Sequence, residues 1–282
     1  YNIPKEEKLT GGYGGRSLWD KFINYSIDKC LKDKGLLLYI NPPSWRKPEH
    51  NLFHKMTQDN QIIYLKSLTE GDGHKYFDCG VITDYYLLEK TIHYKTTIFD
   101  SQDGQRHELD LQNWDFIPNG SIDKMTSILG ENEIIYSSSI YDPRKDYIFT
   151  KIKDENYQEY YDRYKDHPEK DNYPYKIIHS MTKKGGIDHL YSSEDKGHIG
   201  IPKVILSFGR HQYPYNDWKG EYGMSCISFG IKISDKEEGD NIVKAINTDE
   251  FKDIIKYTKW NTFQTEWKMF KYLKKDFWKE FI

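Results

Sequence analysis

The spacing of hydrophobic residues predicts a helix and then a strand near the start of the chain. Apolar side chains recur there at intervals of three and four residues, as one face of an amphipathic helix requires: Leu18, Trp19, Phe22, Ile23, Ile27, Cys30 and Leu31. Gly35 is expected to end this helix. The continuous apolar run Leu36–Ile40 follows, and such a run is typical of a strand buried on both faces of a parallel sheet.

Further elements follow this strand in an alternating order. Residues 51–60 predict a second helix, residues 61–68 a strand and residues 81–89 another strand, with a turn around Gly71–Gly73 before it. Strand, helix, strand is the order of an α/β fold, in which ligands bind beyond the carboxyl ends of the strands.

The pattern changes after about residue 118, which predicts a second region over residues 119–282. Within it, residues 142–198 are rich in Asp, Lys, Tyr and His and poor in aliphatic residues, which indicates a loop-rich stretch. A strand is predicted at 202–208 and one or two more at 222–233, and short helices are predicted at 238–247 and 249–257.

Composition limits the class of protein. A chain of 282 residues can form two domains, and its net charge of −3 is not that of a basic nucleic-acid binder, so any DNA contact must come from local patches. Cys30, Cys79 and Cys226 are isolated, which argues against a zinc site or a disulfide framework and favours a reducing, intracellular setting. No apolar run approaches the roughly 18 residues of a membrane span.

One short motif invites a chemical interpretation. Asn41-Pro42-Pro43-Ser44-Trp45 is similar to the Asn-Pro-Pro-aromatic catalytic loop of amino-methyltransferases, in which the Asn accepts a hydrogen bond from the target amine and the aromatic ring stacks on the flipped base. Here the aromatic residue comes one position late. The alternative, which we favour for this motif alone, is a Pro-Pro pair that ends a strand.

The residues around the motif resemble a longer pattern. Leu18-Trp19-x-x-Phe22, Gly35, the strand Leu36–Ile40 and Pro43-Ser44-Trp45 are similar to the segment after the catalytic loop of gamma-class, TaqI-like adenine methyltransferases. The resemblance continues through Ile62–Leu65, Gly71 to Phe77 and Val81–Leu88. It implies that residues 1–118 form the C-terminal half of a Rossmann-like methyltransferase sheet, and that Asn41-Pro42-Pro43 is not the catalytic loop.

The same resemblance assigns two catalytic aromatic residues. Tyr1 stands where the family places the aromatic residue of the catalytic tetrapeptide, so the chain would lack the Asn-Pro-Pro and the S-adenosylmethionine-binding front half; the alternative is an arbitrary terminus. Phe77 corresponds to a ring that packs against the flipped adenine, and the alternative is a core Phe.

The end of the chain resembles the target-recognition part of large restriction-modification methylases of the kind found in giant DNA viruses. The carrying segments are Pro202–Ile205, Gly220–Gly223, Lys236–Gly239 through Asn247, and Trp260-Asn261-x-Phe263. Lysines cluster near Trp260, Trp267 and Trp278, which would suit phosphate contact and stacking, although nearby carboxylates make a solvated helix face an alternative. The residues predicted to contact DNA are Pro43, Trp45, Arg46, Lys47, Trp260, Phe263, Lys268 and Lys271.

These inferences predict an α/β protein in two parts: half of a methyltransferase sheet, then a mixed α/β target-recognition region. The function that the resemblance implies is site-specific adenine-N6 methylation of double-stranded DNA with S-adenosylmethionine, by base flipping and without a metal. The isolated chain is expected to be inactive unless a separate cofactor-binding chain completes it. The alternatives are a DNA-binding specificity protein or subunit without chemistry, and a viral structural or interaction protein that keeps only the fold.

Overall fold

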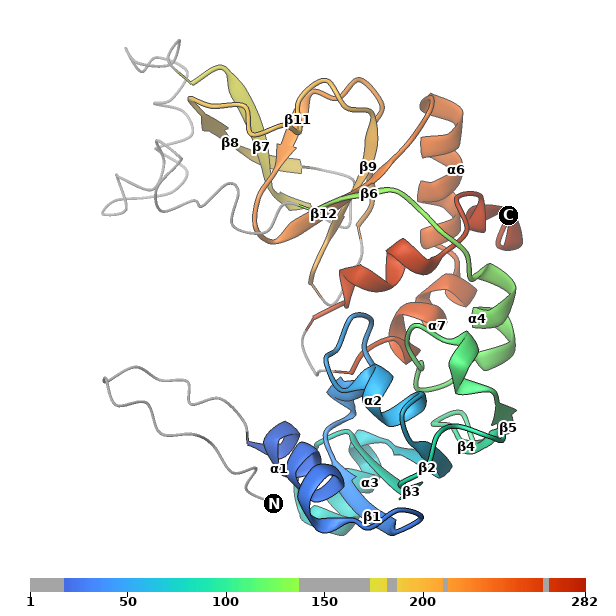
Figure 1. Ribbon diagram of the computed structural model, residues 1–282. Coiled ribbons are helices and arrows are strands. Elements are labelled where there is room, and N and C mark those ends of the chain that lie inside the picture. The colour runs from blue at the N-terminus through green and yellow to red at the C-terminus, as the bar shows by residue number, and fades with distance from the viewer. Residues whose placement is uncertain (1–17, 137–172, 182–186, 210–212, 261–263) are drawn as a thin grey trace, which may run out of the picture. The chain divides into compact units, whose positions relative to one another are not determined.

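A computed structural model describes residues 18–136, 173–181, 187–209, 213–260 and 264–282 (Figure 1). The chain forms two compact units. The first contains Tyr1–Thr126 and Lys256–Thr262, and the second contains Ser127–Ile255 and Phe263–Ile282. The first unit thus includes a segment from near the end of the chain. The predicted division into residues 1–118 and 119–282 does not contain this returning segment. No helix in the described part is long and apolar enough to cross a membrane.

The first unit begins with the predicted helix and strand. Helix α1 (Trp19–Tyr25) continues as a π-helical turn over Ser26–Cys30, and strand β1 (Leu36–Asn41) follows. Helix α2 (Phe53–Thr57), strand β2 (Gln61–Leu68) and strand β3 (Thr83–Glu89) lie within or close to their predicted ranges. The sequence pattern therefore located these five elements correctly.

A five-stranded mixed sheet forms the centre of the first unit (Figure 1). Its order is β1-β3-β2-β4-β5, where β4 is Thr97–Asp100 and β5 is Arg106–Leu109. Strand β3 is antiparallel to both β1 and β2, so β1 and β2 run parallel to each other, and β2 is also parallel to β4. The observed class is α/β with a mixed sheet.

One expectation for β1 is wrong. The strand was predicted to be buried on both faces, but Leu36 and Leu38 are 58% and 69% exposed. Their neighbours Leu37 and Tyr39 are half-buried on the other face, where their partners Leu88 and Tyr86 are fully buried. Strand β1 is the edge of the sheet, and one of its faces is open to solvent. A continuous apolar run therefore did not indicate two covered faces here.

Helix α3 (Glu70–Phe77) occupies the place of the predicted turn before β3. Gly71 and Gly73 favour a turn by composition, but the helix has a strong start: Thr69 Oγ1 accepts from the Asp72 amide, and the Asp72 carboxylate accepts from the Thr69 amide. This reciprocal capping box satisfies two backbone N–H groups that a helix start otherwise leaves unpaired. Asp78 ends the helix in a left-handed conformation with φ of 55°.

The second unit contains two further sheets. The four-stranded sheet has the order β10-β9-β12-β6, with β6 at Ile134–Tyr136, β9 at Lys203–Ser207, β10 at Tyr215–Asp217 and β12 at Ser228–Lys232. The three-stranded sheet has the order β11-β7-β8, with β7 at Tyr175–Met181, β8 at Ile187–Ser192 and β11 at Tyr222–Met224.

The loop-rich prediction for residues 142–198 is wrong at β7 and β8, which pair as an antiparallel ladder, whereas the described residues 193–198 contain no helix or strand. Ile177 and its ladder partner Leu190 are buried, and so is the adjacent Ile178, next to a register shift in β7. The earlier part of that range, up to residue 172, lies outside the described residues.

Helices complete both units. Helix α4 (Ile122–Ile128) leaves the first unit, and α6 (Lys236–Ile246) and α7 (Asp249–Tyr257) match the two predicted short helices. Short 3-10 helices lie at Pro43–Arg46, Leu111–Asn113, Trp267–Tyr272 and Phe277–Glu280. In the second unit, Phe251 lies with its ring centroid 6.1 Å from Phe270 and 5.5 Å from Phe277, and these buried rings form an aromatic core.

Candidate functional site

The chain turns sharply after β1, at the sequence motif that resembles a catalytic loop. Asn41 is buried, and its side-chain amide donates to the Pro42 carbonyl oxygen over 2.8 Å. Pro43 then starts the 3-10 helix, and Pro43, Trp45 and Arg46 are all buried. The geometry is that of a strand-ending turn anchored in the core.

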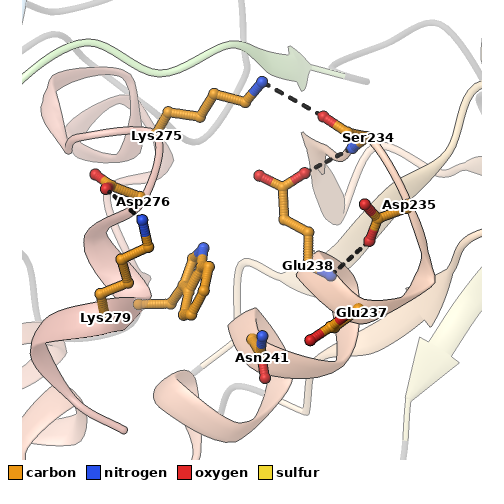
Figure 2. A pocket seen from close by; sticks show the side chains of 9 residues that line it. Ser234, Asp235, Glu237, Glu238, Asn241, Lys275, Asp276 and Lys279 are labelled. Atoms are coloured by element: carbon orange, nitrogen blue, oxygen red, sulfur yellow. Dashed lines mark hydrogen bonds and ion pairs between the residues drawn. The ribbon is translucent and has the colours of Figure 1, made fainter.

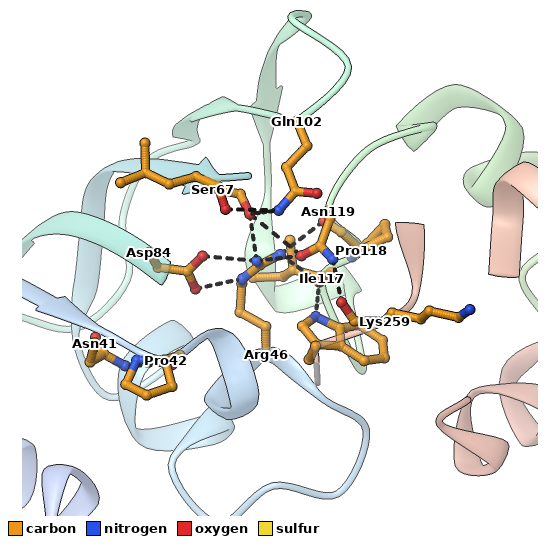
Figure 3. A network of polar contacts seen from close by, with 12 residues as sticks. Asn41, Pro42, Arg46, Ser67, Asp84, Gln102, Ile117, Pro118, Asn119 and Lys259 are labelled. Atoms are coloured by element: carbon orange, nitrogen blue, oxygen red, sulfur yellow. Dashed lines mark hydrogen bonds and ion pairs between the residues drawn. The ribbon is translucent and has the colours of Figure 1, made fainter. Parts of the chain in front are cut away.

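Arg46 is the centre of a buried polar network in the first unit (Figure 3). Its Nε and Nη2 donate to the two carboxylate oxygens of Asp84 over 2.7 and 2.8 Å, in a bidentate arrangement. Nη2 also donates to Ser67 Oγ over 2.9 Å and to Asn119 Oδ1 over 2.6 Å. Nη1 donates to the carbonyl oxygens of Ile117 and Pro118 over 2.9 and 3.0 Å.

The network extends to the returning segment near the end of the chain. Trp260 is buried, and its indole Nε1 donates to the Ile117 carbonyl over 2.9 Å. The Asn119 side-chain amide donates to the Lys259 carbonyl over 2.7 Å (Figure 3). The Asn119 backbone amide donates to the Tyr257 carbonyl over 2.6 Å. Arg46 and Asn119 together fix the segment at 117–119 against the segment at 257–260.

Burial determines how Asp84 behaves in this network. Burial raises the pKa of the Asp84 carboxyl, and the paired Arg46 guanidinium opposes that rise. Both side chains are fully buried, so the pair is inaccessible to a substrate. Its chemistry is structural, because a buried ion pair holds its surroundings in place but is poorly placed for proton transfer to a ligand.

The predicted DNA contacts that lie in the first unit do not form a surface. Pro43, Trp45, Arg46 and Trp260 are buried, so the DNA-binding role predicted for them does not fit their positions. Lys47 is half-buried at the end of the 3-10 helix. The four buried side chains pack in the turn and the core of the first unit. A sequence pattern of aromatic and basic residues does not distinguish such buried side chains from those of a contact surface.

Phe77 is the last residue of α3 and is half-buried. Its ring meets Tyr76 edge to face at a centroid distance of 6.4 Å. A partly exposed ring at a helix end before β3 is compatible with contact to a ligand, and it is not the fully buried ring of a core residue. Tyr1, the other predicted catalytic residue, lies outside the described residues.

Lys268 and Lys271 both lie near one tryptophan ring in the second unit. Their ammonium groups are 6.0 and 5.1 Å from the Trp267 ring centroid, within the range of a cation–π interaction. All three residues are half-exposed, while Met269 and Phe270 between them are buried. The two predicted lysines therefore share one surface with an aromatic ring, whereas Phe263 lies outside the described residues.

A second buried ion pair, which no local sequence pattern indicates, lies in the second unit. Lys203 Nζ donates to Asp217 Oδ2 over 2.7 Å and to the His198 carbonyl over 2.9 Å, and both side chains are essentially inaccessible. Burial lowers the pKa of Lys203 and raises the pKa of Asp217, and each partner's charge opposes the other's shift. Lys203 belongs to the Pro202–Ile205 segment, but no local sequence pattern identifies Asp217 as its partner.

A pocket of about 490 Å³ lies at the start of α6 (Figure 2). Side chains of the same segment cap the N-terminus of this helix. The Asp235 carboxylate accepts from the Glu238 amide over 2.9 Å, and the Glu238 carboxylate accepts from the Ser234 amide over 2.6 Å. Lys279 and Asp276 pair across 3.1 Å at the opposite wall. These pairs occupy several of the charged lining groups, whereas the indole Nε1 of Trp278, which also lines the pocket, is buried without a hydrogen-bond partner. The described residues contain no cluster of side chains that could hold a metal ion.

Comparisons with known proteins give distant likenesses only. No protein-family model matches the chain, and no curated protein matches it. Among solved structures, the chain is similar to the Type IIL restriction-modification enzyme MmeI in complex with DNA, with a TM-score of 0.44 and 7% identity over 79% of this chain and 36% of that one. It is also similar to the type IIG restriction endonuclease BpuSI, with a TM-score of 0.36 and 7% identity over 94% of this chain and 42% of that one. The chain spans less than half the length of either enzyme, and at these TM-scores neither likeness determines its function.

Proposed function

We propose that this chain is the later part of a DNA adenine-N6 methyltransferase of the restriction-modification type, followed by its target-recognition region. In the complete enzyme, S-adenosylmethionine would supply the methyl group, and its binding residues would belong to the front half of the catalytic domain or to a separate chain. The proposal rests on the sequence resemblance over residues 1–118 and 200–282, and it is supported by the position of Phe77.

The partial exposure of Phe77 at the end of α3 is the single observation that supports the proposal best. The resemblance assigns its ring to the face of an extruded adenine, and such a ring must reach solvent or a ligand. The Phe77 ring meets this condition, because it is half-buried at the end of α3. An aromatic face returns about 1–3 kcal/mol per stacked base, which offsets part of the cost of extruding it.

The mixed sheet is also compatible with the proposal. Strands β1 and β2 run parallel, and the chain between them passes through α2, as in a βαβ unit. Strand β3 then enters between them antiparallel. Residues 41–46 follow the carboxyl end of β1, and Glu70–Phe77 follows the carboxyl end of β2. In open α/β sheets, ligands bind beyond these ends.

The test is methylation by the complete reading frame. We expect expression of the genomic reading frame that contains this sequence to introduce N6-methyladenine into host DNA, measured by mass spectrometry of nucleosides. Phe77→Ala should lower the methyl content and the fluorescence of 2-aminopurine at the target position. Tyr25→Ala is the matched control, because Tyr25 is an exposed aromatic residue of the same unit, on α1. Unmodified DNA from a stably expressed protein would contradict the proposal.

The burial of Asn41 favours a second candidate, a DNA-binding specificity protein without chemistry of its own. Asn41-Pro42-Pro43 is the one Asn-Pro-Pro in the sequence, and its Asn is buried and donates to the Pro42 carbonyl. The Asn41 Oδ1, the atom that would accept from a target amine, is buried and has no hydrogen-bond partner, so the turn would have to open before an amine could reach it. Sequence-specific DNA binding by the complete reading frame, without methylation, would favour this candidate over the first.

A further inference from the structure

The turn between β10 and β11 presents a tryptophan to solvent. Trp218 follows Asp217 at the end of β10, and its residue is 42% exposed. The neighbouring Lys219 places its ammonium group 5.4 Å from the centroid of the Trp218 ring. Four residues, from Asp217 to Gly220, carry the chain from one strand to the approach of the next.

A buried ion pair holds the base of this turn. Asp217 accepts from Lys203 Nζ over 2.7 Å, and it also accepts from the backbone amides of Glu221 and Tyr222 over 2.8 and 3.1 Å. The Asp217 carbonyl accepts from the Gly220 amide over 3.0 Å, which closes the turn. Asp217 therefore accepts hydrogen bonds from the residues that close and follow the turn, and its own carboxylate is held by the buried Lys203.

Gly220 restricts the turn further. Its φ is +67°, which favours glycine, and a Cβ there would come within 2.6 Å of the Ile201 amide nitrogen. The Gly220 carbonyl accepts from the Gly200 amide over 2.8 Å, so the turn is also tied to the segment before β9. The backbone under Trp218 is thus held in one conformation by contacts that do not involve the indole.

We propose that the Trp218–Lys219 turn is a DNA-contacting element of the second unit, with Lys219 on a backbone phosphate and the Trp218 ring against the adjacent sugar or base edge. This inference rests on the proposed function, in that the chain must bind DNA. A ring held on a fixed turn loses little conformational freedom on binding, which favours it as a contact residue. A cation beside an exposed ring is the combination that phosphate contact and stacking use.

The neighbouring charges are compatible with this role. The Glu221 carboxylate lies 4.0 Å from Lys219 Nζ, and both side chains are more than half exposed. Such an exposed pair contributes little energy, so a phosphate can replace the carboxylate at small cost. The lysine beside the ring favours DNA over an apolar protein surface as the partner.

The test measures binding of the complete chain to a fluorescein-labelled DNA duplex by anisotropy over a range of salt concentrations. We expect Trp218→Ala to weaken binding about tenfold, as the loss of one aromatic contact does. Lys219→Gln should lower the slope of log K against log salt by about one. Tyr94→Ala is the control, because Tyr94 is an exposed aromatic residue of the first unit with Lys95 at 5.2 Å from its ring.

The outcomes separate this inference from the proposed function. If the unchanged chain binds DNA and both turn variants bind equally well with an equal salt slope, the inference is overturned while DNA binding stands. If both variants bind DNA normally but lose a protein partner, the turn is a protein contact and the inference is also overturned. If the unchanged chain does not bind DNA at any salt concentration, the proposed function fails together with the inference. Selective weakening in the turn variants, with Tyr94→Ala unchanged, supports it.

Discussion

Arg46 shows how far the role of a side chain can lie from its sequence context. Next to Trp45 and Lys47 it resembles a basic, aromatic contact surface, yet it makes six hydrogen bonds inside the first unit. Its partners lie between 21 and 73 positions away in the sequence. No local pattern contains that information. The turn itself was predictable, because Pro-Pro after an apolar run ends a strand.

The energetic importance of Arg46 can be measured by removing one partner of the pair. Arg46→Met should lower the free energy of unfolding by about 3–5 kcal/mol, because it leaves the Asp84 carboxylate buried without its counter-charge. Arg46→Lys should recover only part of the loss, since an ammonium group lacks the planar fork. Urea denaturation gives both values. Arg106→Met is the control, because Arg106 pairs with Asp100 at the surface, and a change of about 0–1 kcal/mol is expected there. Equal effects of Arg46→Met and Arg106→Met would contradict the network.

His198 predicts a dependence of stability on pH. Burial, together with the nearby Lys203, lowers the pKa of His198 to about 4, and Asp195 opposes this shift. The Met224 amide donates to His198 Nδ1 over 3.1 Å, so that nitrogen must be unprotonated. The unfolded chain binds a proton below about pH 6.5, whereas the folded chain does so only near pH 4. Stability contributed by the neutral ring is therefore present above pH 6.5 and is lost as the pH falls toward 4.

The measurement compares the unchanged protein with His198→Asn, whose carboxamide oxygen can accept from Met224 but does not titrate. Urea unfolding between pH 7.5 and 4 should show a slope for the unchanged protein that is steeper by at most about 1.4 kcal/mol per pH unit, the value for one proton. Identical slopes would mean that His198 does not carry this dependence.

At the scale of elements, periodicity located α1, β1, β2, α6 and α7, but it did not predict which faces would be covered. Strand β1 is apolar at every position from Leu36 to Ile40, yet Leu36 and Leu38 are exposed, because no described element covers that face of the strand. Helix α3 was missed for the opposite reason. Its glycines suggested a turn, while the Thr69 and Asp72 capping box was the signal that could have identified a helix start.

The two glycines of α3 give a matched pair of substitutions. Gly71→Ala should stabilise the protein by about 0.4–1 kcal/mol, because a Cβ there meets only Thr69 Oγ1 at 3.5 Å and alanine restricts the unfolded chain. Gly73→Ala should destabilise it, since its Cβ would lie 2.3 Å from the Val81 carbonyl oxygen. Thermal melts of the two variants should move in opposite directions. A shift in the same direction for both would show that α3 does not pack against the residues before β3 in this way.

At the scale of the molecule, the chain leaves the first unit after Thr126 and returns to it at Lys256–Thr262. Sequence order predicted two parts but not this return, because the contacts that hold it join residues more than 130 positions apart: Trp260 to Ile117 and Asn119 to Lys259. The buried role of Trp260 depends on this return. As part of a linear motif it resembled a contact residue, and only the long-range pairing assigns it to the core.

The net charge of the chain excludes a general electrostatic attraction to DNA. The chain carries a net charge of −3, so attraction to DNA must come from a local group of cations such as Lys268 and Lys271, which lie over the Trp267 ring. If both contact phosphates, replacing them with Gln should lower the slope of log K against log salt by about two. Replacing the exposed Lys29 and Lys32 of the first unit with Gln changes the net charge equally. We expect that control pair to leave the slope unchanged when both are measured by anisotropy on the same duplex. If both pairs of substitutions lowered the slope equally, the effect would come from net charge alone. Lys268 and Lys271 would then be solvated surface residues without phosphate contacts.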